Sequence, residues 1–198
     1  MQYISYYHSP IGNILLASDN IGLTGLWFEN QKYYAYNLDQ EHQEKELPIF
    51  EQTKKWLDIY FSGKEPNFTP SLHMVGTPFQ ITVWKILQQI PYGKTITYGE
   101  IAYKVAQQKG ISKMSAQAIG GAVGHNGISI IVPCHRVVGT NGSLTGYAGG
   151  IDRKIKLLSL EKVSVQHYFI PKKGKYILYI LEMVRVLNVR GKFIMFDT

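Results

Sequence analysis

A thiol and an imidazole stand side by side in the segment "IIVPCHRVVG", residues 130–139. Cys134 is the only cysteine among 198 residues, and His135 follows it directly. A thiol attacks efficiently only as the thiolate, and its ordinary pKa of about 8.5 leaves little thiolate at neutral pH unless a base lies close. Adjacent side chains on a strand point to opposite faces, so a Cys–His pair needs a bend, which Pro133 can supply. The residues alone leave two alternatives, an activated nucleophile and a buried inert thiol.

Composition limits the classes of protein that can carry such a thiol. With 45% hydrophobic and 13% aromatic residues, the chain is expected to fold as one domain or two small ones. A lone cysteine forms no internal disulfide, and no secretory signal is visible near the start, which favours a cytoplasmic location. The longest apolar run, "YILYILEMV" in the tail, is too short and too interrupted to span a bilayer.

Charge is distributed unevenly along the chain. Residues 1–76 contain 5 Lys/Arg and 9 Asp/Glu, residues 77–161 contain 9 and 3, and residues 162–198 contain 7 and 2. A basic region after an acidic one suggests a polyanionic partner, with nucleic acid as the leading candidate. Small basic domains that bind no polyanion are the alternative.

The first region, residues 1–76, reads as a scaffold. Short runs with β-branched and aromatic residues, separated by turns, predict a small antiparallel sheet. The stretch 41–47 reads as a solvated charged segment. A helix is predicted from Pro48 to just before Gly63, with one apolar face that covers the sheet.

The second region, residues 77–161, is predicted to be helical and to contain a short active-site strand, so the fold class is α+β. Thr77, Pro78 and Gln80 form the signature of a capped helix start. Two short helices follow, at 98–108 and 115–126, and their arrangement is typical of a helix-turn-helix. The run "ISIIVP" predicts the strand that leads to Cys134, and a last helix carries Glu161 near its end.

The helix at 115–126 is unusually rich in small residues, with "AIGGAVG" at its centre. Each glycine costs a helix about 1 kcal/mol relative to alanine, so the pair Gly120 and Gly121 needs a reason. One reason is close approach to an outside surface such as a DNA groove, and the other is close packing against a neighbouring helix.

The segment "PCHRVVG", with "HNGISIIV" before it and "NGSLTGYAGG" after it, resembles the methylated-DNA–protein-cysteine methyltransferases, also called O6-alkylguanine-DNA alkyltransferases. The resemblance covers residues 77–161 closely, including "FQITVW", "IPYGKTITYGEIA" and "SAQAIGGAVG". It covers residues 1–76 more loosely, through "SPIGNILLASDNIGLTGLWFE".

The resemblance implies a role for each reactive residue. Cys134 would accept the alkyl group in an SN2 step, and His135 would deprotonate it through a bridging water. Glu161 would orient the imidazole, although the residue by itself is more typical of a solvated helix end. Asn126 would hold the turn before the active-site strand, and Tyr98 would donate to the guanine leaving group and crowd the adjacent phosphate.

The same resemblance implies how the substrate is bound. Tyr147 and the backbone of Ala148 and Gly149 would line the base pocket, and Lys154 would lie near the leaving group or else be an exposed helix lysine. The target base must leave the duplex, and small residues would let the helix enter the minor groove. Gln117 stands where relatives commonly carry an arginine that intrudes into the base stack, which predicts weaker or slower base extrusion.

The resemblance therefore implies stoichiometric, irreversible repair of double-stranded DNA that contains O6-alkylguanine, with O4-alkylthymine as the alternative lesion. No cofactor and no metal are expected, because relatives that bind zinc use N-terminal cysteines that this chain lacks. The protein is expected to act as a monomer, away from membranes. The extension 162–198 fits none of these roles, and truncation after Lys175 is expected to leave alkyl transfer intact. A non-catalytic binder of alkylated DNA and a thiol hydrolase are the competing functions.

Overall fold

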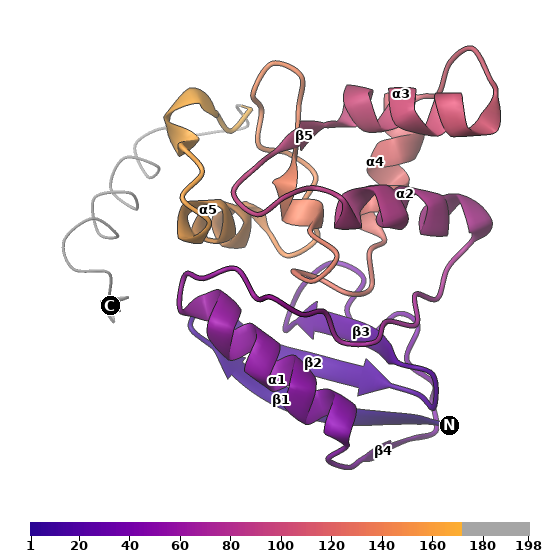
Figure 1. The fold of residues 1–198 in the computed structure, drawn as a ribbon, viewed down its shortest axis with the longest axis vertical. Helices are drawn as coiled ribbons and strands as arrows, with labels where there is room; N and C mark the ends of the chain where they lie inside the picture. The colour runs from indigo at the N-terminus through magenta and orange to yellow at the C-terminus, as the bar shows by residue number, and fades with distance from the viewer. Residues whose placement is uncertain (172–198) are drawn as a thin grey trace.

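The computed structural model describes residues 1–171, apart from the side chain of His167. A four-stranded sheet with one helix across it forms one part, and a group of helices packed above the sheet forms the other (Figure 1). The part of the extension from residue 172 to 198, with the truncation point at Lys175, lies outside the described residues. Among residues 1–171, no helix combines the length and apolar content needed to cross a membrane.

The sheet has the strand order β3-β2-β1-β4, with β1 at Gln2–Ser9, β2 at Gly12–Ser18, β3 at Leu23–Phe28 and β4 at His42–Glu44. Strands β1, β2 and β3 form the predicted antiparallel pairs, in a register that places Tyr3 opposite Ser18. The stretch 41–47 is largely exposed, as expected, but it also contains a fourth strand, β4, that was not predicted. This strand pairs parallel to β1, so the sheet is mixed and not purely antiparallel. The three side chains of β4 are all exposed, so no alternating apolar pattern marks it as a strand.

Helix α1 (Pro48–Phe61) lies across one face of the sheet (Figure 1). Pro48 occupies the first turn as predicted, where its missing N–H costs no hydrogen bond. The buried face of the helix consists of Phe50, Thr53, Trp56, Leu57, Tyr60 and Phe61.

Three helices form the next part of the chain, α2 (Pro78–Gln88), α3 (Tyr98–Lys109) and α4 (Ala116–Gly124). The predicted capping box at Thr77 and Gln80 is present, and a second one joins Thr97 and Glu100 at the start of α3. These caps satisfy backbone N–H groups that have no partner within the helix, which fixes where each helix begins. Helix α5 (Ile151–Leu160) ends with Glu161 as its C-cap.

The apolar run before Cys134 does not form the predicted strand. Residue Ile128 makes one isolated bridge to Leu26, and residues 129–131 form a turn. The chain then makes a short 3₁₀ helix, η1 (Cys134–Arg136), and only afterwards strand β6 (Val137–Val138), which pairs parallel with β5 (Ile96–Thr97). Short apolar runs fit a buried turn as well as a strand, which is why the pattern misled.

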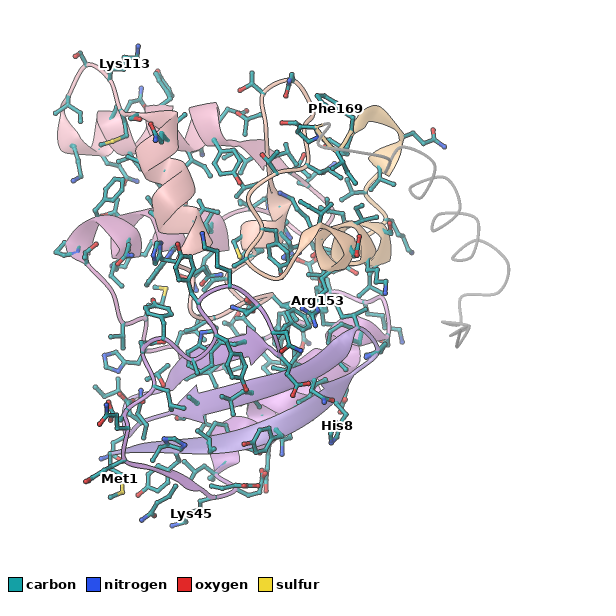
Figure 2. The ribbon with its side chains drawn as sticks, turned by 180° about the vertical axis from the view of Figure 1, so that it is seen from behind. Met1, His8, Lys45, Lys113, Arg153 and Phe169 are labelled. Atoms are coloured by element: carbon teal, nitrogen blue, oxygen red, sulfur yellow. The ribbon has the colours of Figure 1, made fainter. Side chains whose placement is uncertain are left out.

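One cluster of buried side chains runs through both the sheet and the helices, from Leu16 and Phe28 to Val83, Val132 and Leu157. Arg153 of α5 adds polar contacts across the same junction, where Figure 2 shows it between the sheet and the helices. Its guanidinium donates to the carbonyls of Ile11 and Glu29 at 3.1 Å each.

The described part of the extension also packs against the helical part. A second, smaller cluster contains Val165 together with Val138, Leu144, Ile155 and Leu158. Phe169, labelled in Figure 2, accepts a backbone hydrogen bond of 2.8 Å from Leu144 through its carbonyl. Residues 165–169 thus support the loop that follows Cys134 and β6.

Candidate active site

Cys134 opens the 3₁₀ turn and is 4% exposed. Asn126 holds this turn together: its amide nitrogen Nδ2 lies 3.0 Å from Cys134 Sγ and 2.8 Å from the Val132 carbonyl oxygen. Asn126 Oδ1 also accepts from the backbone N–H of Ile128 at 3.0 Å. The side chain of Asn126 therefore spans the whole turn and donates directly toward the sulfur.

Burial raises the pKa of the Cys134 thiol, and the Asn126 hydrogen bond and the charge of Lys154 oppose that rise. Lys154 is fully buried, and its ammonium donates to the carbonyls of Val137 at 2.5 Å and Thr145 at 2.9 Å. Burial lowers the pKa of Lys154 to about 8, although the nearby Cys134 favours its charged form. Lys154 is therefore a buried cation beside the thiol and not an exposed helix lysine.

His135 and Glu161 form a fully buried pair, with Nε2 of the imidazole 2.7 Å from Glu161 Oε1. Among residues 1–171, Nδ1 of His135 is buried and has no hydrogen-bond partner. Burial lowers the pKa of His135 more than Glu161 raises it, so the ring is neutral at neutral pH. Because Nε2 faces the carboxylate, its hydrogen lies there and Nδ1 carries the free lone pair.

The Glu161 carboxylate accepts hydrogen bonds from several donors. Oε2 accepts from Arg136 Nε at 2.8 Å and from the Gly93 N–H at 3.1 Å. Oε1 accepts from Arg136 Nη2 at 3.0 Å and from the Tyr60 hydroxyl at 2.7 Å, besides His135. Although burial raises the pKa of Glu161, these partners lower it to about 2, with His135 the largest contributor, so the carboxylate stays ionised.

Tyr98 and Gly146 form one wall beside the thiol. The Tyr98 hydroxyl donates to the Thr145 carbonyl at 3.1 Å, and burial, together with Cys134, raises its pKa to about 12. Gly146 has φ of 75°, and a Cβ atom there would lie 2.5 Å from Tyr98 Oη. Only glycine fits this close approach in that backbone conformation.

A pocket of about 240 Å³ opens between this wall, helix α4 and the loop after β3. It is lined by Lys32, Tyr33, Gly120, Gly121, Gly124, His125, Gly146, Tyr147 and Ala148. Of the three residues expected to line a base pocket, Tyr147 and Ala148 lie here. Gly149 lies behind them, where its carbonyl accepts from Arg153 Nη1 at 3.2 Å and a Cβ atom would lie 2.5 Å from the Tyr147 ring.

Helix α4 presents its glycines to the outside. A Cβ atom at Gly121 or Gly124 would meet nothing within 4 Å, and at Gly120 only the Tyr98 ring at 3.9 Å. The opposite face packs inward through Ile119, Ala122 and Val123. Close helix packing therefore does not explain the glycines. Gln117 is exposed near the start of this helix.

Several side chains that contact this site were not predicted from the sequence. Tyr60 and Arg136 bind Glu161, while Lys32 and Tyr33 line the pocket from the region interpreted as scaffold. Tyr60 lies on the apolar face predicted for the helix that begins at Pro48, and nothing in that pattern indicates a role for its hydroxyl. A signal was available for the loop of Tyr33, where an excess of tyrosines lies next to a turn, but no pattern in the chain links it to Cys134.

No group of three or more His, Cys, Asp and Glu side chains in residues 1–171 is arranged to hold a metal ion. The donors around Glu161 bind its carboxylate, while His135 Nδ1 and the Tyr147 hydroxyl are buried without a hydrogen-bond partner among residues 1–171.

Comparison with known proteins places this site in a family. The model of the 6-O-methylguanine DNA methyltransferase DNA binding domain matches residues 78–163, and the model of its ribonuclease-like domain matches residues 2–73. Among solved structures, the chain is similar to a Mycobacterium tuberculosis O6-methylguanine methyltransferase, with a TM-score of 0.68 and 44% identity over 82% of this chain and 93% of that one. It is also similar to a Mycobacterium tuberculosis OGT in complex with DNA, with a TM-score of 0.68 and 41% identity over 83% of this chain and 98% of that one.

Curated relatives agree. A methylated-DNA–protein-cysteine methyltransferase from Haemophilus influenzae is 41% identical over 81% of this chain and 87% of its own length. One from Methanosarcina mazei is 46% identical over 79% of this chain and 97% of its own length. The chain belongs to the methylated-DNA–protein-cysteine methyltransferase family and is a methyltransferase.

Proposed function

We propose that this protein repairs double-stranded DNA by moving the alkyl group of O6-alkylguanine irreversibly onto Cys134. The observation that carries the proposal is the arrangement of Cys134, which lies in a tight turn directly before a buried His135–Glu161 pair. Nucleophile, base and orienting carboxylate are the three parts that covalent thiol chemistry needs.

The transfer is a single displacement. The Cys134 thiol gives its proton to Nδ1 of His135, through a water, and Sγ becomes a thiolate. A sulfur electron pair forms the S–CH₃ bond while the O6–CH₃ bond breaks. Guanine leaves with the electron pair of the broken O6–CH₃ bond and takes up a proton. The free lone pair on Nδ1 supports His135 as the acceptor of the thiol proton.

Two side chains stabilise the developing thiolate. Asn126 donates toward Sγ at 3.0 Å, and the buried ammonium of Lys154 contributes a positive charge close by. Both favour the charged sulfur over the neutral thiol, against the effect of burial. Asn126 also keeps the turn in place, so removal of its side chain would displace the nucleophile.

The pocket between α4 and the loop after Cys134 receives the extruded base. Tyr147 and the backbone of Ala148 and Gly149 would contact the purine, and Tyr98 would donate to the leaving group. The Tyr98 hydrogen is on the Thr145 carbonyl in the free protein, so this donation requires it to exchange partners.

DNA is the partner of the α3–α4 unit. The open glycine face of α4 fits entry into a minor groove of about 6 Å width, and three exposed lysines, Lys104, Lys109 and Lys113, can meet phosphates. Figure 2 shows Lys113 at the tip of the loop before α4, far from the sheet. The related OGT from Mycobacterium tuberculosis in complex with DNA supports the same partner.

Three segments of the chain have different proposed roles. Residues 77–161 bind DNA and accept the alkyl group, residues 1–76 support them, and residues 162–198 form an extension. The thioether at Cys134 has no second thiol in the sequence to release it, so each molecule reacts once.

The test is the stoichiometry of transfer from an excess of duplex carrying radiolabelled O6-methylguanine. One label retained per protein molecule supports the proposal. Retention of no label with tight binding would indicate a non-catalytic binder of alkylated DNA, and release of many labels per protein would indicate a hydrolase. The control is Cys134→Ser, which removes the proposed acceptor sulfur and should retain no label.

A further inference from the structure

Tyr60, which belongs to the part formed by the sheet and α1, contacts the His135–Glu161 pair. It lies on α1, its ring stacks on Trp56 with centroids 5.3 Å apart, and it is completely buried. Its hydroxyl oxygen lies 2.7 Å from Glu161 Oε1 and 3.3 Å from His135 Nε2. A tyrosine ring would pack equally well without this hydroxyl, so the hydroxyl itself needs an explanation.

The hydrogen of the Tyr60 hydroxyl has one possible direction. A carboxylate only accepts, and Glu161 is ionised, so Tyr60 donates to Oε1. The hydroxyl oxygen then has only lone pairs to offer His135. Nε2 therefore faces two acceptors, Glu161 Oε1 and Tyr60 Oη, and both require the hydrogen to lie on Nε2.

The hydrogen bond from Tyr60 to Glu161 Oε1 also weakens the electrostatic attraction between the carboxylate and a protonated imidazole. Oε1 is shared among His135, Tyr60 and Arg136, so its charge is dispersed over three donors. A carboxylate with fewer donors would draw a second proton onto the ring more strongly. The hydroxyl therefore keeps Nδ1 free and the ring neutral.

We propose that Tyr60 is a positioning residue that fixes His135 as a neutral base with its free lone pair on Nδ1. This inference rests on the proposed function, since it assigns Nδ1 the task of receiving the thiol proton. Tyr60 itself does not exchange protons, because burial, reinforced by the charge of Glu161, holds its pKa well above the ordinary value.

The other charged and titratable groups around the pair come from several elements. They are Arg136 of η1, Glu161 at the end of α5, Lys154 of α5, Cys134, Tyr147 and Tyr92. Arg136 and the Gly93 N–H bind Oε2, so removal of the Tyr60 hydroxyl leaves the carboxylate held in place. Removal of the Tyr60 hydroxyl therefore changes only the hydrogen bonds to Glu161 Oε1, the oxygen that also binds His135.

The first test needs no DNA. The full chain is labelled with ¹⁵N-histidine, His135 is assigned by its absence in His135→Gln, and its ring nitrogens are followed through a pH titration. In the wild type we expect the hydrogen on Nε2. In Tyr60→Phe the ring should take its second proton at a higher pH, because Oε1 has lost a competing donor.

The matched control is Tyr92→Phe. This ring packs edge-on against Tyr60 and its hydroxyl contacts the Leu160 carbonyl at 3.3 Å, but it makes no hydrogen bond to Glu161. It should leave the His135 titration unchanged. If Tyr60→Phe does not fold, the wild-type spectrum alone still decides, because a ring hydrogen on Nδ1 would overturn the assignment.

The second test is the rate of methyl transfer from a methylated duplex across the same pH range. Tyr60→Phe should be about tenfold slower at neutral pH, the value of one lost hydrogen bond, and should recover at higher pH as the ring becomes neutral again. An equal loss at every pH, or an unchanged His135 titration, would overturn the proposal. Failure of the wild type to take methyl from DNA would refute the proposed function instead and leave the spectroscopic result to decide the role of Tyr60.

Discussion

The two sides of Cys134 differ in how completely they are filled. On the proton side, His135 and Glu161 are buried and Glu161 accepts hydrogen bonds from five donors. On the substrate side, the glycines of α4 face open space beside a pocket of about 240 Å³. In the proposed mechanism the contrast separates two tasks, because His135 must be held in one protonation state while the DNA duplex must be admitted.

This contrast predicts opposite responses to mutation. A change on the proton side leaves buried donors unpaired and should cost both stability and chemistry. Changes on the substrate side should alter DNA recognition while leaving the fold intact or stabilising it.

The largest effect is expected from Glu161→Gln. A glutamine amide places an N–H₂ group against Arg136, Tyr60 or His135, all of which are donors. Breaking a buried pair costs about 3–5 kcal/mol, and loss of an oriented base should slow transfer by about 100-fold or more. Urea unfolding and single-turnover rates measure the two effects, with Glu51→Gln, an exposed acid in the first turn of α1, as the control. A near-normal rate in Glu161→Gln would contradict the account of the proton side.

Acid should lower the free energy of unfolding of the wild type, because it protonates Glu161. The pKa of Glu161 is lowered from an ordinary 4.5 to about 2, so its contribution is complete above about pH 4.5 and is lost as the pH falls toward 2. The contribution amounts to about 3 kcal/mol. Urea unfolding at a series of pH values measures it, and Glu161→Gln should abolish this part of the pH dependence. An equal slope in the variant would show that other carboxylates are responsible.

Two glycines sharpen the comparison. Gly146→Ala places a Cβ atom against Tyr98 Oη at φ of 75°, so it should lower the free energy of unfolding by about 1–3 kcal/mol and slow transfer.

Gly121→Ala places a Cβ atom in open space on α4, so it should raise the free energy of unfolding by up to about 1 kcal/mol while weakening duplex binding. Urea unfolding and fluorescence anisotropy with duplex DNA measure the pair.

Gly110→Ala is the control for the cost of a positive φ, because a Cβ atom there meets nothing within 4 Å. If Gly121→Ala bound duplex DNA as tightly as the wild type, the open face of α4 would not be the groove-binding surface.

The smallest effect is expected from Gln117→Arg. Arginine adds a charge and a longer side chain at the exposed start of α4, which should speed repair of duplex DNA by roughly twofold to fivefold. The reaction with free O6-methylguanine, which needs no base extrusion, should be unchanged. A lower rate on duplex DNA would refute the role given to this helix.

Much of the fold could be predicted because its signals are local. Thr77 and Pro78 fix the start of α2, and the glycines after Phe61 and Lys109 follow the ends of α1 and α3. Strand β4 and the turn before Cys134 could not be predicted, since exposed strands lack alternation and buried turns share the apolar composition of strands.

The candidate site divides in the same way. Cys134, His135 and Asn126 lie within one short segment, so a resemblance could name them together. Tyr60 is 101 positions from Glu161, and its periodic position marks it only as a core residue. Its hydroxyl acquires significance through tertiary packing, which no local pattern encodes.

The central claim is that the sulfur of Cys134 takes the methyl group. Intact mass followed by peptide sequencing, after mixing with duplex that contains O6-methylguanine, tests it directly. We expect one added methylene mass, located on Cys134, and an unmodified Cys134→Ser variant. Methyl on any other residue, or loss of methyl from the DNA with an unmodified protein, would contradict the account.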